Sequence, residues 1–292
     1  MGQIYKTLIY DGQISLSVLD TTDIVNKAIE YHNLSPLAAA GLGRALTVAA
    51  FMSSSLKNEN EKLSITISGN GAGGKIVVAA DGKLNVRGSI VNPQADLPLK
   101  PNGKLDVGGL VGKDGYITVV KDLGLKEPYV GKCRLVSGEI GEDFAAYFAY
   151  SEQQPTAIAV GVLIKNGKCV GAGGVILQPL PDCSEEALSN AEKIIGEFSD
   201  VSKKISDGGA KGIIEKYFAE YNFTAYETEY KCGCNKKYVD KVLISLGRKE
   251  FSDIIDEEGK IEVSCEFCNK KYVYGKTDEE RLFGSENGGK DS

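Results

Sequence analysis

The sequence predicts an α+β protein that carries a small metal-binding module in its last quarter. Three observations indicate this. Over residues 1–182, strand-like stretches are interrupted by a few helices without strict alternation, which favours an α+β core. Residues 183–225 follow with an amphipathic helical pattern typical of a linker. Four of the seven cysteines then gather in residues 226–283, and we expect the polar, glycine-rich tail at 284–292 to be disordered.

The composition is that of a soluble globular protein, with 42% hydrophobic and 25% charged residues. The net charge of −6 lacks the basic footprint of a nucleic-acid binder. The N-terminus has no uninterrupted apolar core of a signal peptide, and no apolar run approaches the roughly 18 residues of a membrane span. We therefore expect a cytoplasmic protein with neither nucleic acid nor a membrane as partner.

The N-terminal range contains several recognisable elements. Ile14, Leu16 and Val18 alternate with polar residues after the Asp11-Gly12 turn, which predicts a hairpin. Ser35-Pro36 has the cap and first-turn residues of a helix that we expect to run to about Lys57. Further along the chain we expect strands at 63–68, 75–81, 84–91 and 116–120, a helix at 140–151, and a hairpin of 156–165 with 168–178 around Asn166-Gly167.

The linker range predicts one amphipathic helix from Ser184 to Ile205, ended by Gly208-Gly209. Leu188, Ile195 and Phe198 form an apolar stripe that a soluble helix must bury, so we regard them as the candidate switch residues of the linker. Gly196 lies within the predicted helix and weakens it. The pattern leaves two interpretations open, a stable connecting helix and a deliberately marginal one.

The cysteine spacing carries the chemistry. Cys232 and Cys234 form one close pair, and Cys265 and Cys268 form a second pair thirty residues later. Two such pairs converge on one tetrahedral zinc ion in four-thiolate sites. With all four positions filled by protein, no position remains for a hydrolytic water. Nearby lysines favour the thiolate form, namely Lys231, Lys236, Lys237, Lys270 and Lys271.

A closed zinc site can be structural or can act as a switch. A module of about 58 residues buries little surface and needs a staple, and zinc supplies it. Oxidation of the thiolates would remove that stabilisation. A disulfide between Cys232 and Cys234 would close a small strained ring that is easily reduced. The residues alone leave both interpretations open.

The cysteine pairs stand in a wider set of motifs that resembles the heat-shock protein 33 family of redox-regulated bacterial chaperones. Leu246-Gly247-Arg248-Lys249-Glu250 lies between the pairs, and Tyr272 lies just after them. Further matching motifs follow the family order along nearly the whole chain: Leu42-Gly43-Arg44-Ala45-Leu46, Val86-Arg87-Gly88 with Asn92-Pro93, Lys121-Asp122-Leu123-Gly124, Val136-Ser137-Gly138-Glu139 and Ser151-Glu152-Gln153. Ala72 departs from the pattern, since relatives usually carry proline there.

The resemblance implies an ATP-independent holdase, a chaperone without enzymatic activity, that is inactive when reduced and zinc-bound. It implies that oxidation pairs Cys232 with Cys234 and Cys265 with Cys268, and that zinc then leaves. The module and the linker would loosen and make apolar surface available to unfolding client proteins. It also implies a homodimer in the oxidised, active form.

Three alternatives compete with this interpretation. A zinc ribbon with a purely structural zinc would bind nucleic acid or act as a scaffold, but residues 226–275 carry nine Lys and Arg against ten Asp and Glu, a net of −1. A thiol-disulfide oxidoreductase would use Cys265 and Cys268 at a strand-to-helix junction. A dinucleotide fingerprint at residues 69–74 precedes a predicted strand instead of the required helix. We expect His32 to be an ordinary, partly exposed side chain, and Cys133, Cys169 and Cys183 to be small buried residues.

Overall fold

The structure, a computed structural model, describes residues 1–284 and divides into two compact units, Met1–Lys231 and Cys232 onward. The α+β class predicted from the sequence is confirmed. The expected linker, residues 183–225, falls inside the larger unit. The domain boundaries that we expect at 182 and 225 stay predictions, and the expected tail lies outside the described residues except for Gly284.

The larger unit is built on one ten-stranded sheet in the order β7-β6-β3-β4-β5-β10-β1-β2-β9-β8. Every described neighbour pair is antiparallel except β5 with β10. The strands are β1 (Gly2–Ile9), β2 (Ile14–Asp20), β3 (Lys62–Ser68), β4 (Ile76–Asp81), β5 (Asn85–Ile90), β6 (Tyr116–Asp122), β7 (Tyr129–Arg134), β8 (Ala157–Lys165), β9 (Lys168–Pro179) and β10 (Thr224–Tyr230).

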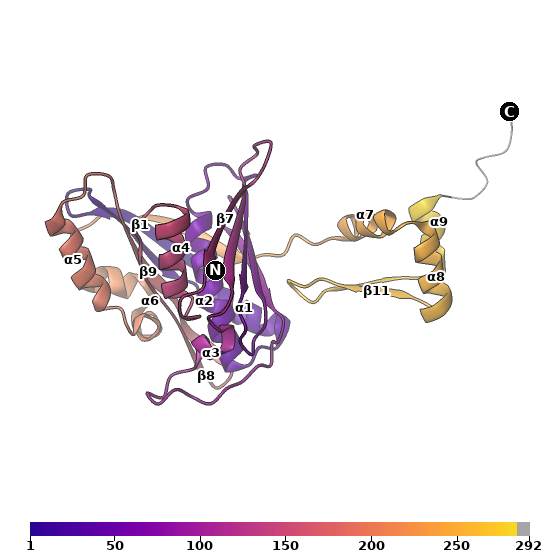
Figure 1. Cartoon of the computed structure of the whole chain (residues 1–292), viewed down its shortest axis with the longest axis horizontal. Helices are drawn as coiled ribbons and strands as arrows, with labels where there is room; N and C mark the ends of the chain where they lie inside the picture. The colour runs from indigo at the N-terminus through magenta and orange to yellow at the C-terminus, as the bar shows by residue number, and fades with distance from the viewer. Residues whose placement is uncertain (285–292) are drawn as a thin grey trace. The chain divides into compact units, whose positions relative to one another are not determined.

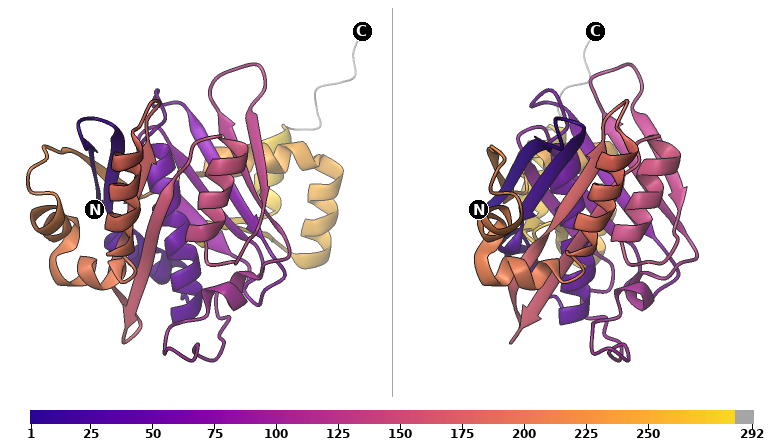
Figure 2. Two further views of the ribbon diagram at one scale, coloured as in Figure 1. Left: turned by 60° about the vertical axis from the view of Figure 1, so that its left-hand side comes forward. Right: turned by 90° about the vertical axis from the view of Figure 1, so that its left-hand side faces the viewer.

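Helices cover both faces of the β1-β2-β9-β8 half of this sheet (Figures 1 and 2). Ile4 and Ile176 face one apolar core with α1 (Thr22–His32), α2 (Pro36–Ser53), α3 (Val107–Val111) and α4 (Gly141–Ser151). Their neighbours Tyr5 and Val175 point to the opposite face and pack in a second core with α5 (Glu185–Gly196) and α6 (Val201–Tyr217). The linker segment is therefore the outer layer of the larger unit.

Local signals set the predicted turns and the start of α2. Asn166 and Gly167 have φ of 50° and 73°, the left-handed pair that a two-residue hairpin requires. The Ser35 hydroxyl accepts a 3.0 Å hydrogen bond from the Ala38 N–H and caps α2. This helix ends at Ser53, four residues before the predicted Lys57.

Helix α2 is a core helix. A Cβ atom on Gly43 would lie 2.9 Å from side-chain atoms of Val25 and Val162, so only glycine permits this close packing. Among residues 1–284, α2 is the one helix long and apolar enough to cross a membrane, with a mean hydropathy of 1.3, and 89% of it is buried within the protein. The prediction that no stretch approaches a membrane span is therefore wrong by length and composition. The burial of α2 within the protein identifies it as a core helix.

The linker prediction is wrong about where the helix breaks. The chain leaves helical geometry after Gly196 and forms two helices, α5 and α6, instead of one continuous helix to Ile205. Phe198 lies in the connection, where it turns into the second core. Gly209 does interrupt the helical geometry, with φ 65° and ψ −171°, but as a kink inside α6.

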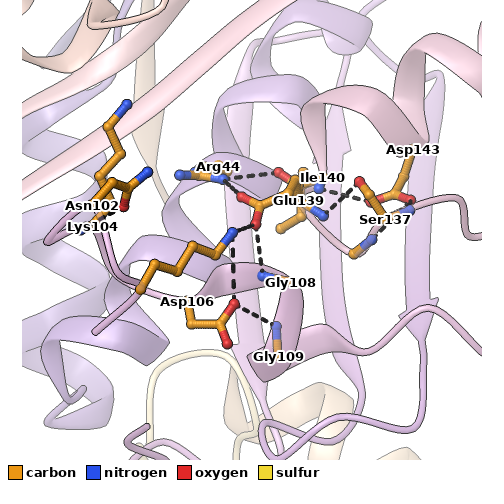
Figure 3. Close-up of polar contacts among 12 residues, drawn as sticks. Arg44, Asn102, Lys104, Asp106, Gly108, Gly109, Ser137, Glu139, Ile140 and Asp143 are labelled. Atoms are coloured by element: carbon orange, nitrogen blue, oxygen red, sulfur yellow. Dashed lines mark hydrogen bonds and ion pairs between the residues drawn. The ribbon is translucent and has the colours of Figure 1, made fainter. Parts of the chain in front are cut away.

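A polar cluster joins motifs that are distant in the sequence (Figure 3). Arg44 of α2 donates a 2.8 Å ion-paired hydrogen bond to the Glu139 carboxylate, which also accepts from the Gly108 N–H at 3.1 Å and from Lys100. The fully buried Asp143 carboxylate accepts four backbone N–H groups, from Val136, Ser137, Gly138 and Ile140, at 2.7–3.1 Å. This carboxylate fixes the loop that presents Glu139 to Arg44.

Replacing Asp143 with asparagine is expected to destabilise the larger unit by about 3 kcal/mol. The amide N–H₂ of asparagine cannot accept a hydrogen bond, so at least one backbone N–H that now donates to the carboxylate would be left without an acceptor. At about 2–4 °C per kcal/mol for a unit of this size, its melting temperature should fall by several degrees. Thermal unfolding followed by circular dichroism checks this. The neighbouring exposed Glu142→Gln is the matched control. Equal melting of the two variants would contradict the role given to Asp143.

The smaller unit contains α7 (Lys236–Leu246), α8 (Arg248–Glu258), α9 (Lys276–Phe283) and a hairpin of β11 (Ile261–Ser264) with β12 (Lys271–Tyr274). Its buried apolar residues form one small cluster: Val239, Leu243, Phe251, Ile255, Ile261, Tyr272 and Tyr274. A core of this size gives a unit of about 50 residues only marginal stability.

Candidate metal centre

Two loops of the smaller unit position the four cysteines. Cys232 and Cys234 precede α7, whose start is fixed by Asn235, since its side chain accepts a 3.0 Å hydrogen bond from the Tyr238 N–H. Cys265 and Cys268 lie in the turn between β11 and β12. There the Cys265 carbonyl accepts from the Asn269 N–H at 2.9 Å, and the Cys265 N–H donates to the Lys270 carbonyl at 3.0 Å. This tight turn brings both sulfurs into the same cluster.

The four Sγ atoms lie within 4.8 Å of one another. The Cys232 and Cys265 sulfurs are 3.5 Å apart, and those of Cys234 and Cys268 are 3.4 Å apart. Four sulfurs at 2.3 Å from a central zinc ion lie about 3.8 Å from one another, so this cluster fits a tetrahedral zinc ion. The separations exceed the length of a disulfide bond, roughly 2.05 Å, and all four cysteines are free thiols here.

One hydroxyl group contacts the cluster. Tyr272 of β12 donates a hydrogen bond to the Cys234 sulfur at 3.2 Å. Partial burial works against the Cys234 thiolate, but the hydrogen bonds from Tyr272 and from the neighbouring thiols outweigh it and lower the pKa of Cys234. Burial raises the pKa of Cys232 and of Cys268. Because a metal binds thiolates, its binding here would release the protons of the thiols that it displaces.

Three of the five lysines named around the cluster are paired with carboxylates. Lys231 pairs with Glu229 at 3.0 Å, Lys271 with Glu262 at 2.7 Å, and Lys236 with Asp278 at 3.7 Å. These carboxylates offset the charge of the three lysines, which weakens the effect that we expect the lysines to have on the thiolates. The sequence did place Tyr272 among the matching motifs, but its hydrogen bond to Cys234 depends on the fold of the hairpin and could not be derived from spacing.

The other cysteines and the histidine lie in the larger unit. Cys169 is buried, which raises its pKa to about 12, whereas Cys133 and Cys183 are only half-buried. The prediction of buried cysteines is therefore right for Cys169 and wrong for the other two. His32 is the last residue of α1 and is partly exposed, as predicted.

Two of the alternative functions lose their structural basis. Cys265 and Cys268 lie in a hairpin turn between β11 and β12, not at the strand-to-helix junction that a thioredoxin-like pair uses. The glycine-rich residues 69–74 connect β3 to β4, which are antiparallel strands, so no helix N-terminus follows to bind a pyrophosphate.

The three linker residues have different surroundings. Phe198 is only 1% exposed, and its ring lies 5.1 Å from that of Tyr217 and 6.1 Å from that of Phe218. Ile195 is half-buried against the same core. Leu188 is 41% exposed, so the prediction that the whole stripe is buried is wrong for this residue. Phe198 lies beyond the break after Gly196 and does not share a helix with Leu188.

The comparisons with known proteins agree over almost the whole chain. Residues 2–275 match the family described as Hsp33 protein. The 33 kDa chaperonin of Alkaliphilus metalliredigens is 42% identical over 280 residues, which cover 94% of this chain and 96% of that protein. The 33 kDa chaperonin of Ruminiclostridium cellulolyticum is 44% identical over 266 residues, covering 90% and 91%. The crystal structure of the 33 kDa chaperonin (heat shock protein 33 homolog) of Thermotoga maritima superposes with a TM-score of 0.88 at 37% identity, covering 96% of this chain and 97% of that one.

Proposed function

The chain belongs to the Hsp33 family of redox-regulated holdases, and from this premise we propose that Cys232, Cys234, Cys265 and Cys268 are the zinc ligands whose oxidation activates it. The observation that carries the proposal is the convergence of the four sulfurs within 4.8 Å. As a member of this family the protein is a chaperone without enzymatic activity that binds unfolding client proteins. Bound zinc would supply the charge that keeps the four thiolates together.

Oxidation acts on this unit through its small core. A hairpin and three helices are held by seven buried apolar side chains and by the cysteine loops. A structural zinc site contributes on the order of 10–16 kcal/mol of apparent binding energy, more than such a core supplies. Conversion of the thiolates to disulfides removes the donors, so the unit loses most of its stability in one step.

After oxidation of the cysteines, we expect the linker to loosen and the chain to form a homodimer. The linker helices α5 and α6 belong to the larger unit, precede the cysteine unit in sequence, and pack on the sheet in the second core, which includes Phe198. Opening of the zinc unit would loosen this segment and expose the apolar surface beneath it. The active form would be a homodimer in the cytoplasm. The domain limits at residues 182 and 225 describe the parts that respond differently to oxidation.

Peroxide with mild heat is expected to release close to one zinc ion per chain and to form one disulfide within each cysteine pair. Formation of each disulfide removes two electrons and two protons from two thiols. One hydrogen peroxide accepts these electrons and protons and becomes two waters, and the reaction passes through a sulfenic acid. Metal analysis before and after treatment, with peptide mapping of the disulfides, measures both results. Peroxide without heat on the zinc-bound protein serves as the control.

The mapping is informative because the folded cluster does not favour the expected pairs. The two short sulfur distances, 3.5 and 3.4 Å, each join cysteines of different pairs. Within-pair disulfides close loops of three and four residues, which stay short after the unit unfolds. A Cys232–Cys265 or Cys234–Cys268 disulfide would show that oxidation occurs inside the folded cluster, and the proposed pairing would be wrong.

A further inference from the structure

Strand β10 (Thr224–Tyr230) has an unusual place in the sheet. It lies between β1 and β5, in the middle of the ten strands, and ends two residues before Cys232. It pairs with β1 antiparallel over five residues, from Gly2 with Thr228 to Lys6 with Thr224. With β5 it pairs in parallel over only two residues, Glu229 with Asn85 and Tyr230 with Val86. β10 is therefore the strand that joins two half-sheets, and it is the one that follows the linker.

Little apolar burial holds the N-terminal part of β10 in this place. Thr224, Ala225, Tyr226 and Glu227 are exposed, with Tyr226 at 42%, and Thr228 is the one fully buried side chain of the strand. At the other end Tyr230 is half-buried against the first core, with its ring 5.4 Å from that of Tyr31. A strand in the interior of a sheet usually buries one or both faces. Because the free energy of local opening follows the buried apolar area, residues 224–227 can leave the sheet at a lower cost than the neighbouring strands, and the contacts of Thr228 and Tyr230 are what hold β10 in place.

Besides the backbone ladder with β1, further hydrogen bonds fasten β10 at its C-terminal end. The Thr228 hydroxyl donates to the Leu84 carbonyl at 2.8 Å. The Tyr230 hydroxyl donates to the Gly88 carbonyl at 2.8 Å and accepts from the Gly88 N–H at 3.2 Å, and the Lys231 N–H donates to the Val86 carbonyl at 2.9 Å. These contacts immediately precede the first cysteine pair. The fastened end of the strand is thus the end that joins the proposed zinc ligands.

We propose that β10 leaves the sheet in the oxidised protein and that the edge of β1 which it covers, Gly2–Lys6, binds an extended segment of a client chain as an added strand. The inference rests on the proposed oxidation of the cysteine cluster. The native occupant shows what the edge accepts: a five-residue antiparallel strand, held by backbone hydrogen bonds, whose side chains from Thr224 to Glu227 face solvent. Because the β1 edge would bind a client through backbone hydrogen bonds and would not contact most of its side chains, it can accept unfolding proteins of many sequences.

Hydrogen exchange with mass spectrometry on the full-length protein tests this in three states: reduced and zinc-bound, oxidised, and oxidised with thermally unfolding citrate synthase. Residues 224–230 and the amides of β1 that face them should exchange faster after oxidation. In the client complex the β1 amides should regain protection while residues 224–230 stay fast. If α5 and α6 moved away and only uncovered a face of the sheet, the backbone hydrogen bonds between β1 and β10 would remain. Faster exchange of these amides therefore reports on the edge of β1 and not on the face of the sheet.

Three results would overturn the proposal. Residues 224–230 could stay protected after oxidation, which means that the strand does not leave. The β1 amides could remain fast in the client complex, which means that clients bind elsewhere. They could instead be protected in the oxidised protein before client is added, which assigns the edge to a second copy of the chain. Suppression of citrate synthase aggregation, measured on the same samples, shows separately whether the oxidised protein is an active holdase.

A matched pair of variants tests the fastening in the reduced protein. Thr228→Val removes the hydroxyl that bonds to Leu84, whereas Thr224→Val makes the same change at an exposed position of the same strand. Thr228→Val should accelerate exchange of residues 224–230 about fivefold, the effect of one hydrogen bond, with zinc content unchanged. Thr224→Val should change it less than twofold. Equal rates in the two variants would mean that Thr228 does not hold the strand in place.

Discussion

A protein in which Cys232 and Cys265 are both replaced by serine is expected to bind no zinc and to have an unfolded C-terminal unit. Each change removes one sulfur from a different pair, so neither loop keeps two ligands. The apparent binding energy of a structural zinc, on the order of 10–16 kcal/mol, exceeds what the seven-residue core supplies. Metal analysis of the reduced protein should fall from near one zinc ion per chain to near zero.

The matched control for this experiment carries the same cysteine-to-serine change at Cys133 and Cys183, two half-buried cysteines of the larger unit. That variant should keep one zinc ion per chain and a folded C-terminal unit. Two-dimensional NMR of both variants separates loss of metal from general unfolding, because signals of the larger unit should persist in each. Full retention of zinc by the Cys232→Ser, Cys265→Ser protein would exclude the four cysteines as its ligands.

Phe198→Asp is expected to make the protein an active holdase while it is still reduced and zinc-bound. The Phe198 ring is buried in the second core, where it contacts the Tyr217 ring edge to face and stacks on the Phe218 ring. Loss of a buried phenylalanine costs about 3–5 kcal/mol, and a carboxylate in the same apolar place adds a desolvation penalty. The linker should undock, and the variant should suppress aggregation of thermally unfolding citrate synthase without oxidant.

Leu188→Asp supplies the control, since Leu188 belongs to the same linker but is 41% exposed. It introduces the same charge where no core is disrupted, so the reduced variant should remain inactive. Zinc content should stay near one per chain in both proteins, which shows that any activity arises in the linker. If reduced Phe198→Asp is folded, zinc-bound and inactive, the linker is a passive tether.

The sequence predicted the elements with strong local signals. Ser35-Pro36 specified the start of α2, and Asn166-Gly167 specified the turn between β8 and β9, because caps and two-residue turns depend on adjacent residues. The cysteine pairs were equally local: each pair lies in one loop, and the hairpin turn at Cys265 is formed by its own backbone. The convergence of the two pairs followed from the chemistry of four thiolates.

The rest depended on contacts between distant parts of the chain. β10 contains polar residues at most positions and has one buried side chain, so it shows no strand alternation, and its partners in β1 and β5 lie far away in the sequence. The motifs that carry the family resemblance had no assigned contacts until the fold joined them. Arg44 meets Glu139, and Lys121 meets Glu152, which also accepts a hydrogen bond from Tyr147.

The position of β10 in the sequence also determines when the ten-stranded sheet can close during synthesis. β1 is among the first residues to be translated and β10 follows only after the linker, so at roughly 5–20 residues per second the two partners are made on the order of 10–40 s apart. Throughout this interval the half-sheets are unjoined, and contacts of such high sequence separation form slowly. The first cysteine pair emerges directly after β10, so closure of the sheet and acquisition of metal are consecutive steps of biogenesis.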